Sequence, residues 1–167
     1  MNRRILVAAS AVTIAIVAIA LAFIVLSRTG VSTVISATPN EPSAAVGNDF
    51  SIDIRISDAV QLYGWELKLA WNTTILDLVN TTEGEFLKND GNTLFNATME
   101  NTTGYLYLYC TLIGNVQGAN GNGNLATVAF HIREPGYSSL DLYDSKLLNT
   151  LEKLIPHQTH DGYVNAH

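Results

Sequence analysis

The strongest constraint on this chain is a repeated alternation of apolar and polar residues in short runs. Residues 50–57 alternate cleanly, and residues 63–71 and Tyr105–Leu112 repeat the pattern. Because successive side chains of a β-strand point to opposite faces, each run places its apolar residues on one side and its polar residues on the other. Gly, Asn and Asp separate the runs, which is typical of turns. The chain after Gly30 is therefore predicted to form an all-β sandwich or barrel.

The same pattern predicts nine strands. They are expected at residues 31–36, 50–57, 63–71, 75–79, 93–99, 105–112, 125–132, 138–142 and 162–165. Residues 118–124 are expected to form a flexible hairpin loop, and residues 144–154 a turn or two of helix. About 137 residues follow Gly30, enough to bury a two-sheet core. The single cysteine, Cys110, allows no internal disulfide, so packing must hold the domain together.

The N-terminus carries a continuous apolar segment, residues 5–26, without charge, Pro or Gly. As a helix it spans about 33 Å, enough to cross a hydrocarbon core of about 30 Å. Residues 1–30 are therefore expected to be one transmembrane helix anchoring the β-sandwich domain, residues 31–167. Two arginines precede the segment and one follows it, which favours an external C-terminal domain at the cell surface. Secretion after cleavage near Ala37 is the alternative.

Four Asn-x-Thr sequons and the net charge limit further the kind of protein that this chain can be. The sequons lie at Asn72, Asn80, Asn96 and Asn101, and they predict an external glycoprotein, although a chain rich in Asn and Thr carries some by chance. The net charge is −6, and the nine Lys and Arg residues form no run outside the N-terminus. Nucleic-acid binding is excluded, because it needs a basic surface that releases counterions.

The order of five motifs resembles the cohesin family. The motifs are VGNDF at residues 46–50, YGWELKL at 63–69, WNTTILDL at 71–78, GNLATVAF at 123–130 and DGYV at 161–164. The likeness spans residues 31–167. It implies a nine-stranded jelly-roll β-sandwich, related in fold to carbohydrate-binding modules. It also implies a partner, the dockerin, which is a small calcium-loaded helical module on secreted enzymes.

The resemblance further implies a binding face on the outer side of the third, fifth, sixth and eighth strands. Carried onto this sequence, with residues 125–132 assigned to the eighth strand, that face presents Glu66, Lys68, Leu94, Asn96, Thr98, Tyr105, Tyr107, Tyr109, Leu125, Thr127 and His131. The residues expected to bind the partner are Glu66, Lys68, Tyr105, Tyr107, Tyr109, Thr127 and His131.

Independently of the resemblance, three tyrosines on one strand face make a flat amphipathic surface of the kind enriched at protein interfaces. The plainer interpretation is the outer side of a sheet, where Tyr has high β-propensity. Two departures from the family stand out. Asn72 and Thr73 occupy the place of the family's Asp-Pro, and the Asn96 sequon lies on the expected binding face.

No pattern predicts catalysis, a metal or a cofactor. Cys110 is expected to face the core as a small apolar residue. His157 and His160 are three residues apart, which puts them on opposite faces of a strand. They are therefore poorly placed to bind one metal ion together. Glu83 and Glu85 share a loop, but a thin sandwich offers no cleft for paired carboxylates.

The chain is therefore predicted to be a non-catalytic, cohesin-like module that docks a secreted, dockerin-type partner outside the cell. One alternative is a carbohydrate-binding module that stacks polysaccharide sugar rings on the three tyrosines. Another is a structural subunit of a cell envelope or filament, in which residues 31–36 pair with the sheet edge of a neighbouring subunit.

Overall fold

The computed structural model describes residues 32–38 and 43–167. The described part forms one compact unit within Ser32–His167. Its elements are β1 (Thr33–Thr38), β2 (Ser43–Ala44), β3 (Asp49–Ala70), β4 (Leu76–Glu83), α2 (Glu85–Lys88), β5 (Thr93–Glu100), β6 (Tyr105–Leu112), β7 (Ala119–Ile132), β8 (Gly136–Asn149), β9 (His157–His160) and β10 (Gly162–Ala166). The expected anchor, residues 1–30, lies outside the described residues. Among the described residues no helix combines the length and the apolar character needed to cross a bilayer.

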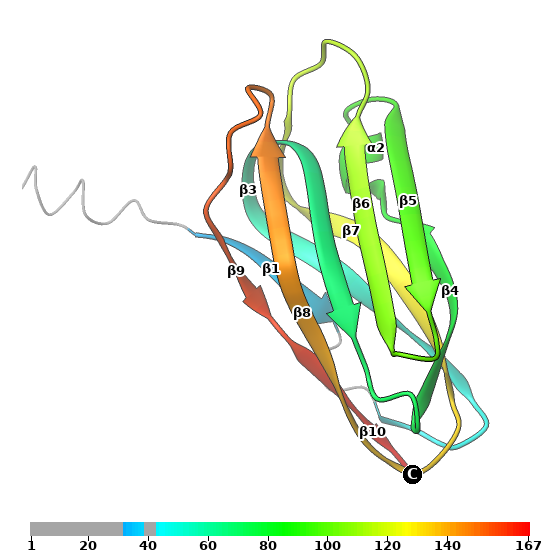
Figure 1. Ribbon diagram of the computed structural model, residues 1–167. Helices are drawn as coiled ribbons and strands as arrows, with labels where there is room; N and C mark the ends of the chain where they lie inside the picture. The colour runs from blue at the N-terminus through cyan, green and yellow to red at the C-terminus, as the bar shows by residue number, and fades with distance from the viewer. Residues whose placement is uncertain (1–31, 39–42) are drawn as a thin grey trace, which may run out of the picture. The chain divides into compact units, whose positions relative to one another are not determined.

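One long strand, β3, belongs to both sheets of the sandwich (Figure 1). Its first part, from Asp49 to Leu62, pairs with β1 and β7, and β4 and β9 extend that sheet on either side. Its second part, from Leu62 to Ala70, pairs with β6 and β8, and β5, β10 and β2 extend the other sheet. The predicted all-β sandwich is confirmed, but two of its expected strands, residues 50–57 and 63–71, are one continuous strand.

The crossing of β3 between the sheets is built from two irregular positions. Asp58 and Gln61 have positive φ values of 54° and 53°, and the register to β7 shifts around them. The backbone N–H of Asp58 donates to Asn122 Oδ1 at 2.7 Å, and that of Gln61 donates to Asn120 Oδ1 at 2.9 Å. Side chains of β7 thus satisfy backbone donors that the bulged ladder leaves unpaired.

Residues 118–124 are therefore largely strand rather than the expected flexible loop, and the prediction was wrong there. The close approach of Gly118 to the backbone of Gln61 explains why a glycine begins this segment. A Cβ at Gly118 would lie 2.3 Å from the carbonyl carbon and oxygen of Gln61. The glycines and asparagines that suggested a loop instead fit the path of β3 against β7.

The core lies between the two sheets and contains the residues that the alternation placed inside. Its fully buried members include Ile52, Ile54, Ile56, Leu67, Leu69, Leu106, Leu108, Val128 and Phe130. Trp71 and Phe50 pack on Phe130 with ring centroids 5.4 and 5.7 Å away, and the Trp71 indole N–H donates to the Leu76 carbonyl at 3.0 Å. The alternation of residues 93–99 puts Phe95, Ala97 and Met99 on one face of the strand, which is expected to face inward, but Met99 is exposed.

Two other expectations differ from the structure. Residues 144–149 continue β8 rather than forming helix, because a single irregular residue, Asp144 with φ 47°, lets the strand resume pairing with β3. The first strand, β1, lies between β3 and β9 and is paired on both sides. Self-assembly through this strand would therefore require it to leave its own sheet, since it has no free edge.

Candidate functional site

The second half of β3 and the whole of β6 lie side by side and form the centre of the candidate site. Their register pairs Glu66 with Tyr109, Lys68 with Tyr107, and Ala70 with Tyr105. The intervening leucines of both strands are buried, so these polar and aromatic side chains all point away from the core. We call the outward-facing side chains of β8, β3, β6 and β5 the tyrosine face.

Glu66 is held at the centre of the tyrosine face by two partners. Tyr107 donates its hydroxyl to Oε2 at 2.7 Å, and the Lys146 ammonium from β8 bonds Oε1. The hydrogen bond from Lys146, followed by that from Tyr107, lowers the pKa of Glu66 below its ordinary value. The hydrogen bond to Glu66 raises the pKa of Tyr107 to about 12. At neutral pH the pair is therefore a carboxylate and a protonated phenol.

Lys68 forms a second cluster beside the first. Its ammonium lies 2.9 Å from Asp144 Oδ2, and 6.0 and 5.8 Å from the ring centroids of Tyr105 and Tyr143. The hydrogen bond to Asp144 raises the pKa of Lys68. The cation is thus neutralised within the domain and lies near two aromatic rings, an arrangement that favours it electrostatically.

The third tyrosine, Tyr109, joins β6 to the edge strand β5. Its hydroxyl accepts a hydrogen bond from Asn96 Nδ2 at 3.0 Å, and its ring centroid lies 5.7 Å from that of Tyr107. The interplanar angle of 43° means that the two rings do not form one flat platform. A shallow hollow of about 390 Å³ runs beside them, bordered by Glu66 and Lys146.

Sequence reasoning missed the contribution of β8. Tyr143, Asp144 and Lys146 all belong to the tyrosine face. Elsewhere on the same side of this sheet, Tyr137 of β8 and Tyr163 of β10 pack with ring centroids 5.1 Å apart. Six of the seven tyrosines in the chain, all except Tyr63, thus lie on the outer side of one sheet. This clustering depends on the pairing of β8 with β3 and with β10, so the sequence alone contained no signal for it.

The structure does not bring Thr127 and His131 to the tyrosine face, and their expected position was wrong. Both lie on β7, which pairs with β4 and with the first half of β3 in the opposite sheet. Thr127 donates to Asp53 Oδ1 at 2.7 Å, and His131 Nδ1 lies 2.6 Å from Asp49 Oδ1. Leu125, expected beside them, is buried. The strand that completes the tyrosine face is β8, not residues 125–132.

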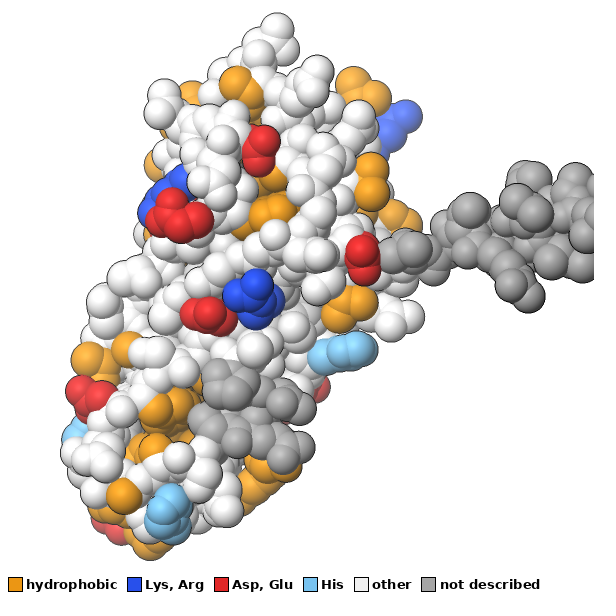
Figure 2. All heavy atoms as spheres, turned by 180° about the vertical axis from the view of Figure 1, so that it is seen from behind, with side chains coloured by type: hydrophobic (Ala, Val, Ile, Leu, Met, Phe, Trp, Pro, Cys, Tyr) orange, Lys and Arg blue, Asp and Glu red, His pale blue; other side chains and the backbone are white. Residues whose placement is uncertain are grey.

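The opposite side of the domain has a different character. Figure 2, viewed from behind Figure 1, shows charged side chains of both signs and separate apolar side chains scattered among uncharged polar and backbone atoms. On β3, which lies between β1 and β7 in this sheet, Asp53 and Arg55 are 3.8 Å apart and both partly exposed. This is the surface expected of a solvated sheet face.

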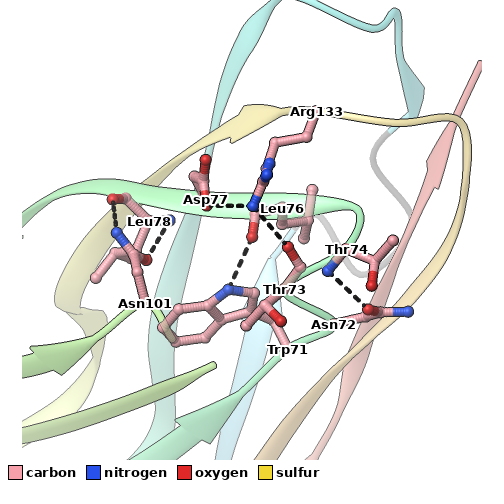
Figure 3. Close-up of polar contacts among 9 residues, drawn as sticks. All are labelled: Trp71, Asn72, Thr73, Thr74, Leu76, Asp77, Leu78, Asn101 and Arg133. Atoms are coloured by element: carbon pink, nitrogen blue, oxygen red, sulfur yellow. Dashed lines mark hydrogen bonds and ion pairs between the residues drawn. The ribbon is translucent and has the colours of Figure 1, made fainter. Parts of the chain in front are cut away.

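All four sequon asparagines are exposed, but their side chains differ in what they contact. Asn96 donates to Tyr109 on the tyrosine face, as described above. Asn101 contacts the backbone of Leu78, and Asn72 begins the turn after β3 (Figure 3). Asn80 lies on β4 in the opposite sheet.

The described residues offer little reactive chemistry. Among them, no group of three or more His, Cys, Asp or Glu side chains is placed to hold a metal ion. Cys110 is buried, and burial followed by its hydrogen bond to Glu83 raises the pKa of the thiol to about 12. The thiol therefore stays protonated at neutral pH and is a poor nucleophile.

Comparison with known proteins gives the same fold. The sequence profile of the cohesin domain matches residues 35–153. A non-cellulosomal cohesin from Archaeoglobus fulgidus is similar in structure with a TM-score of 0.69 and 20% identity, covering 81% of this chain and 91% of that one. A type II cohesin domain from the cellulosome of Acetivibrio cellulolyticus gives a TM-score of 0.70 and 17% identity, covering 80% and 95%.

A cohesin in a type I cohesin–dockerin complex from Clostridium thermocellum gives a TM-score of 0.68 and 10% identity, covering 81% of this chain and 99% of that one. No curated protein sequence matches the chain. The profile covers well over half of the sequence, and the predicted resemblance is confirmed: this chain belongs to the cohesin domain family.

Proposed function

We propose that this domain is a non-catalytic recognition module that binds a dockerin-type protein through the tyrosine face. Solved relatives are described in complex with dockerins, which supports a protein partner for the same fold. The observation that carries the proposal is the concentration of tyrosines around two internally paired charge clusters on one sheet only.

The face has the composition of a protein interface. Tyrosines supply apolar area together with a hydrogen-bonding tip. Glu66 and Lys68 already have partners within the domain, so binding does not leave an isolated charge without a counter-ion. The proposed binding residues are Glu66, Lys68, Tyr105, Tyr107 and Tyr109 from the sequence, with Tyr143 and Lys146 added from β8.

We place the domain outside the cell, tethered by the apolar N-terminal segment. The support is the sequence alone, in which residues 5–26 carry no charge and the four sequons follow them. A module that binds secreted proteins requires such a location.

The test is capture of secreted proteins by the purified chain with and without calcium, followed by mass spectrometry. Tyr107→Asp puts a charge at the centre of the face, and Val79→Asp is the matched control, because Val79 is an exposed apolar residue on β4 in the opposite sheet. Capture of a protein with a dockerin-like module, lost with Tyr107→Asp and kept with Val79→Asp, supports the proposal. Capture that both variants retain contradicts the assigned face.

Parallel incubation with insoluble polysaccharide tests the carbohydrate alternative. One outcome would favour carbohydrate binding over dockerin binding. In that outcome no dockerin-like protein is captured, and the chain is retained on the polysaccharide unless Tyr105, Tyr107 and Tyr109 are all replaced by Ala.

A further inference from the structure

The four sequons are chemically equivalent in sequence, but the fold treats their side-chain amides differently. N-glycosylation forms a bond between Asn Nδ2 and C1 of a sugar, and it breaks the bond from C1 to the phosphate of a lipid-linked glycosyl donor. The phosphate leaves with the electron pair, and Nδ2 loses one proton. The reaction therefore needs an Asn whose Nδ2 is open to solvent and has space for a sugar.

Asn72 meets that requirement. Its Oδ1 accepts the backbone N–H of Thr74, the third residue of its sequon, at 3.0 Å, and its own N–H donates to Ser138 Oγ at 2.9 Å. These bonds fix the residue while its amide nitrogen points away from the turn (Figure 3). Within the described residues Nδ2 has no hydrogen-bond partner, and the residue is exposed.

Asn101 has the opposite arrangement. Its Oδ1 accepts from the Leu78 N–H at 2.9 Å, and its Nδ2 donates to the Leu78 carbonyl at 3.0 Å. Figure 3 shows the amide lying flat against that backbone, as a neighbouring strand would. The side chain thus joins the turn after β5 to β4. A sugar on Nδ2 would have to occupy the space beside β4 or break this pair of bonds.

The side-chain amide of Asn96 is intermediate between those of Asn72 and Asn101 in its hydrogen bonding. Its Nδ2 already donates to the Tyr109 hydroxyl on the tyrosine face. A glycan there would replace one amide hydrogen and cover the proposed binding surface.

From these contacts we infer that Asn72 is a glycan acceptor that the folded domain presents, whereas Asn101 is a structural residue whose sequon stays unoccupied. The inference rests on the proposed external location but not on the identity of the partner. A glycan on Asn72 would leave the tyrosine face uncovered, because Asn72 lies in the turn beyond the end of β3.

The test is glycopeptide mapping of the full-length chain, exported by an N-glycosylating host in which a sequon added after His167 is occupied. That added sequon reports export and glycosylation separately from the behaviour of Asn72. Two threonine variants remove one sequon each without touching the asparagine, Thr74→Ala for Asn72 and Thr103→Ala for Asn101. Asn101→Ala removes the contact with Leu78.

We expect a glycan at Asn72 and none at Asn101. Thr74→Ala should then lose one glycan mass, whereas Thr103→Ala should change neither the mass beyond the substitution nor the thermal unfolding midpoint. Asn101→Ala should lower that midpoint. Occupancy at Asn101, or an unmodified Asn72 in a chain whose added sequon is occupied, would overturn the inference. An unchanged midpoint in Asn101→Ala would overturn the structural role.

Discussion

The hydroxyl of Tyr107 donates to the carboxylate of Glu66 at 2.7 Å and so joins two neighbouring strands across the centre of the tyrosine face. Lys146 bonds the other carboxylate oxygen, so that one acidic side chain connects β6, β3 and β8. This arrangement leads to predictions about the stability of the domain and the titration of Tyr107.

Tyr107→Phe keeps the ring and removes the hydrogen bond. We expect a loss of about 1 kcal/mol in the free energy of unfolding, measured by urea denaturation, because a hydrogen bond to a charged group on a partly exposed surface is worth about that much. Thr98→Val, on the exposed side of β5, is a suitable control. Equal stability of Tyr107→Phe and the wild type would show that the bond contributes nothing in solution.

The titration of Tyr107 gives a second, spectroscopic prediction. Its pKa in the folded domain is raised to about 12 from 10, so the contribution of the hydrogen bond is complete below pH 10 and is lost as the pH rises towards 12. Phenolate absorbance of the folded protein should show a late step near pH 12, and Tyr107→Phe should lack that late step. A late step that persists in the variant would assign it to another residue.

Glu66→Gln should destabilise the domain at neutral pH by about 0.5 to 1 kcal/mol, since Lys146 loses its counter-ion on a partly exposed surface. The pKa of Glu66 is lowered below 4.5 in the folded state, so this stabilisation is present above pH 4.5 and disappears as the pH falls below it. Unfolding curves of the variant and the wild type should converge in acid. A difference that is constant with pH would exclude an ionic contribution.

Phe130→Ala should lower the free energy of unfolding by about 3 to 5 kcal/mol, because the ring is fully buried and packs on both Trp71 and Phe50. Near-ultraviolet circular dichroism should lose signal from Trp71, and the unfolding midpoint should fall. Phe130→Leu retains most of the side-chain volume and should lower the free energy of unfolding by less. That difference would show that the cavity, and not any change at this position of β7, causes the loss.

Asn122→Ala removes the oxygen that accepts the backbone N–H of Asp58. We expect a loss of about 1 kcal/mol, and hydrogen exchange at the Asp58 amide should become faster. Asn115→Ala, in the exposed loop between β6 and β7, should leave both quantities unchanged. Unaltered exchange at Asp58 would mean that water replaces the side chain without cost.

The strands that alternate without interruption were predictable from sequence. In Tyr105–Leu112 the period of two identifies both the buried leucines and the outward-facing, half-buried tyrosines, and the structure places every residue as the pattern requires. The candidate site was predictable to the same extent, since Glu66, Lys68 and the three tyrosines of β6 do lie together.

The alternation of apolar and polar residues could not show the two places where a strand contains an extra residue. In β8, Leu142 and Leu147 are both buried although they are five residues apart, because Asp144 interrupts the alternation. In β3, the bends at Asp58 and Gln61 depend on side chains about sixty positions further along the chain. Local periodicity contains no information about such long-range contacts, so Tyr143 and Lys146 were missed and residues 125–132 were assigned to the wrong sheet.

The sharing of β3 by both sheets has a mechanical consequence. A force applied by a partner to Glu66 or Lys68 enters a strand whose other half is bonded to β1, where the described chain begins. Tension therefore passes from one sheet to the other along covalent backbone, and it does not depend on van der Waals adhesion between the layers. Load applied at the tyrosine face can therefore reach β1 without the two layers sliding apart.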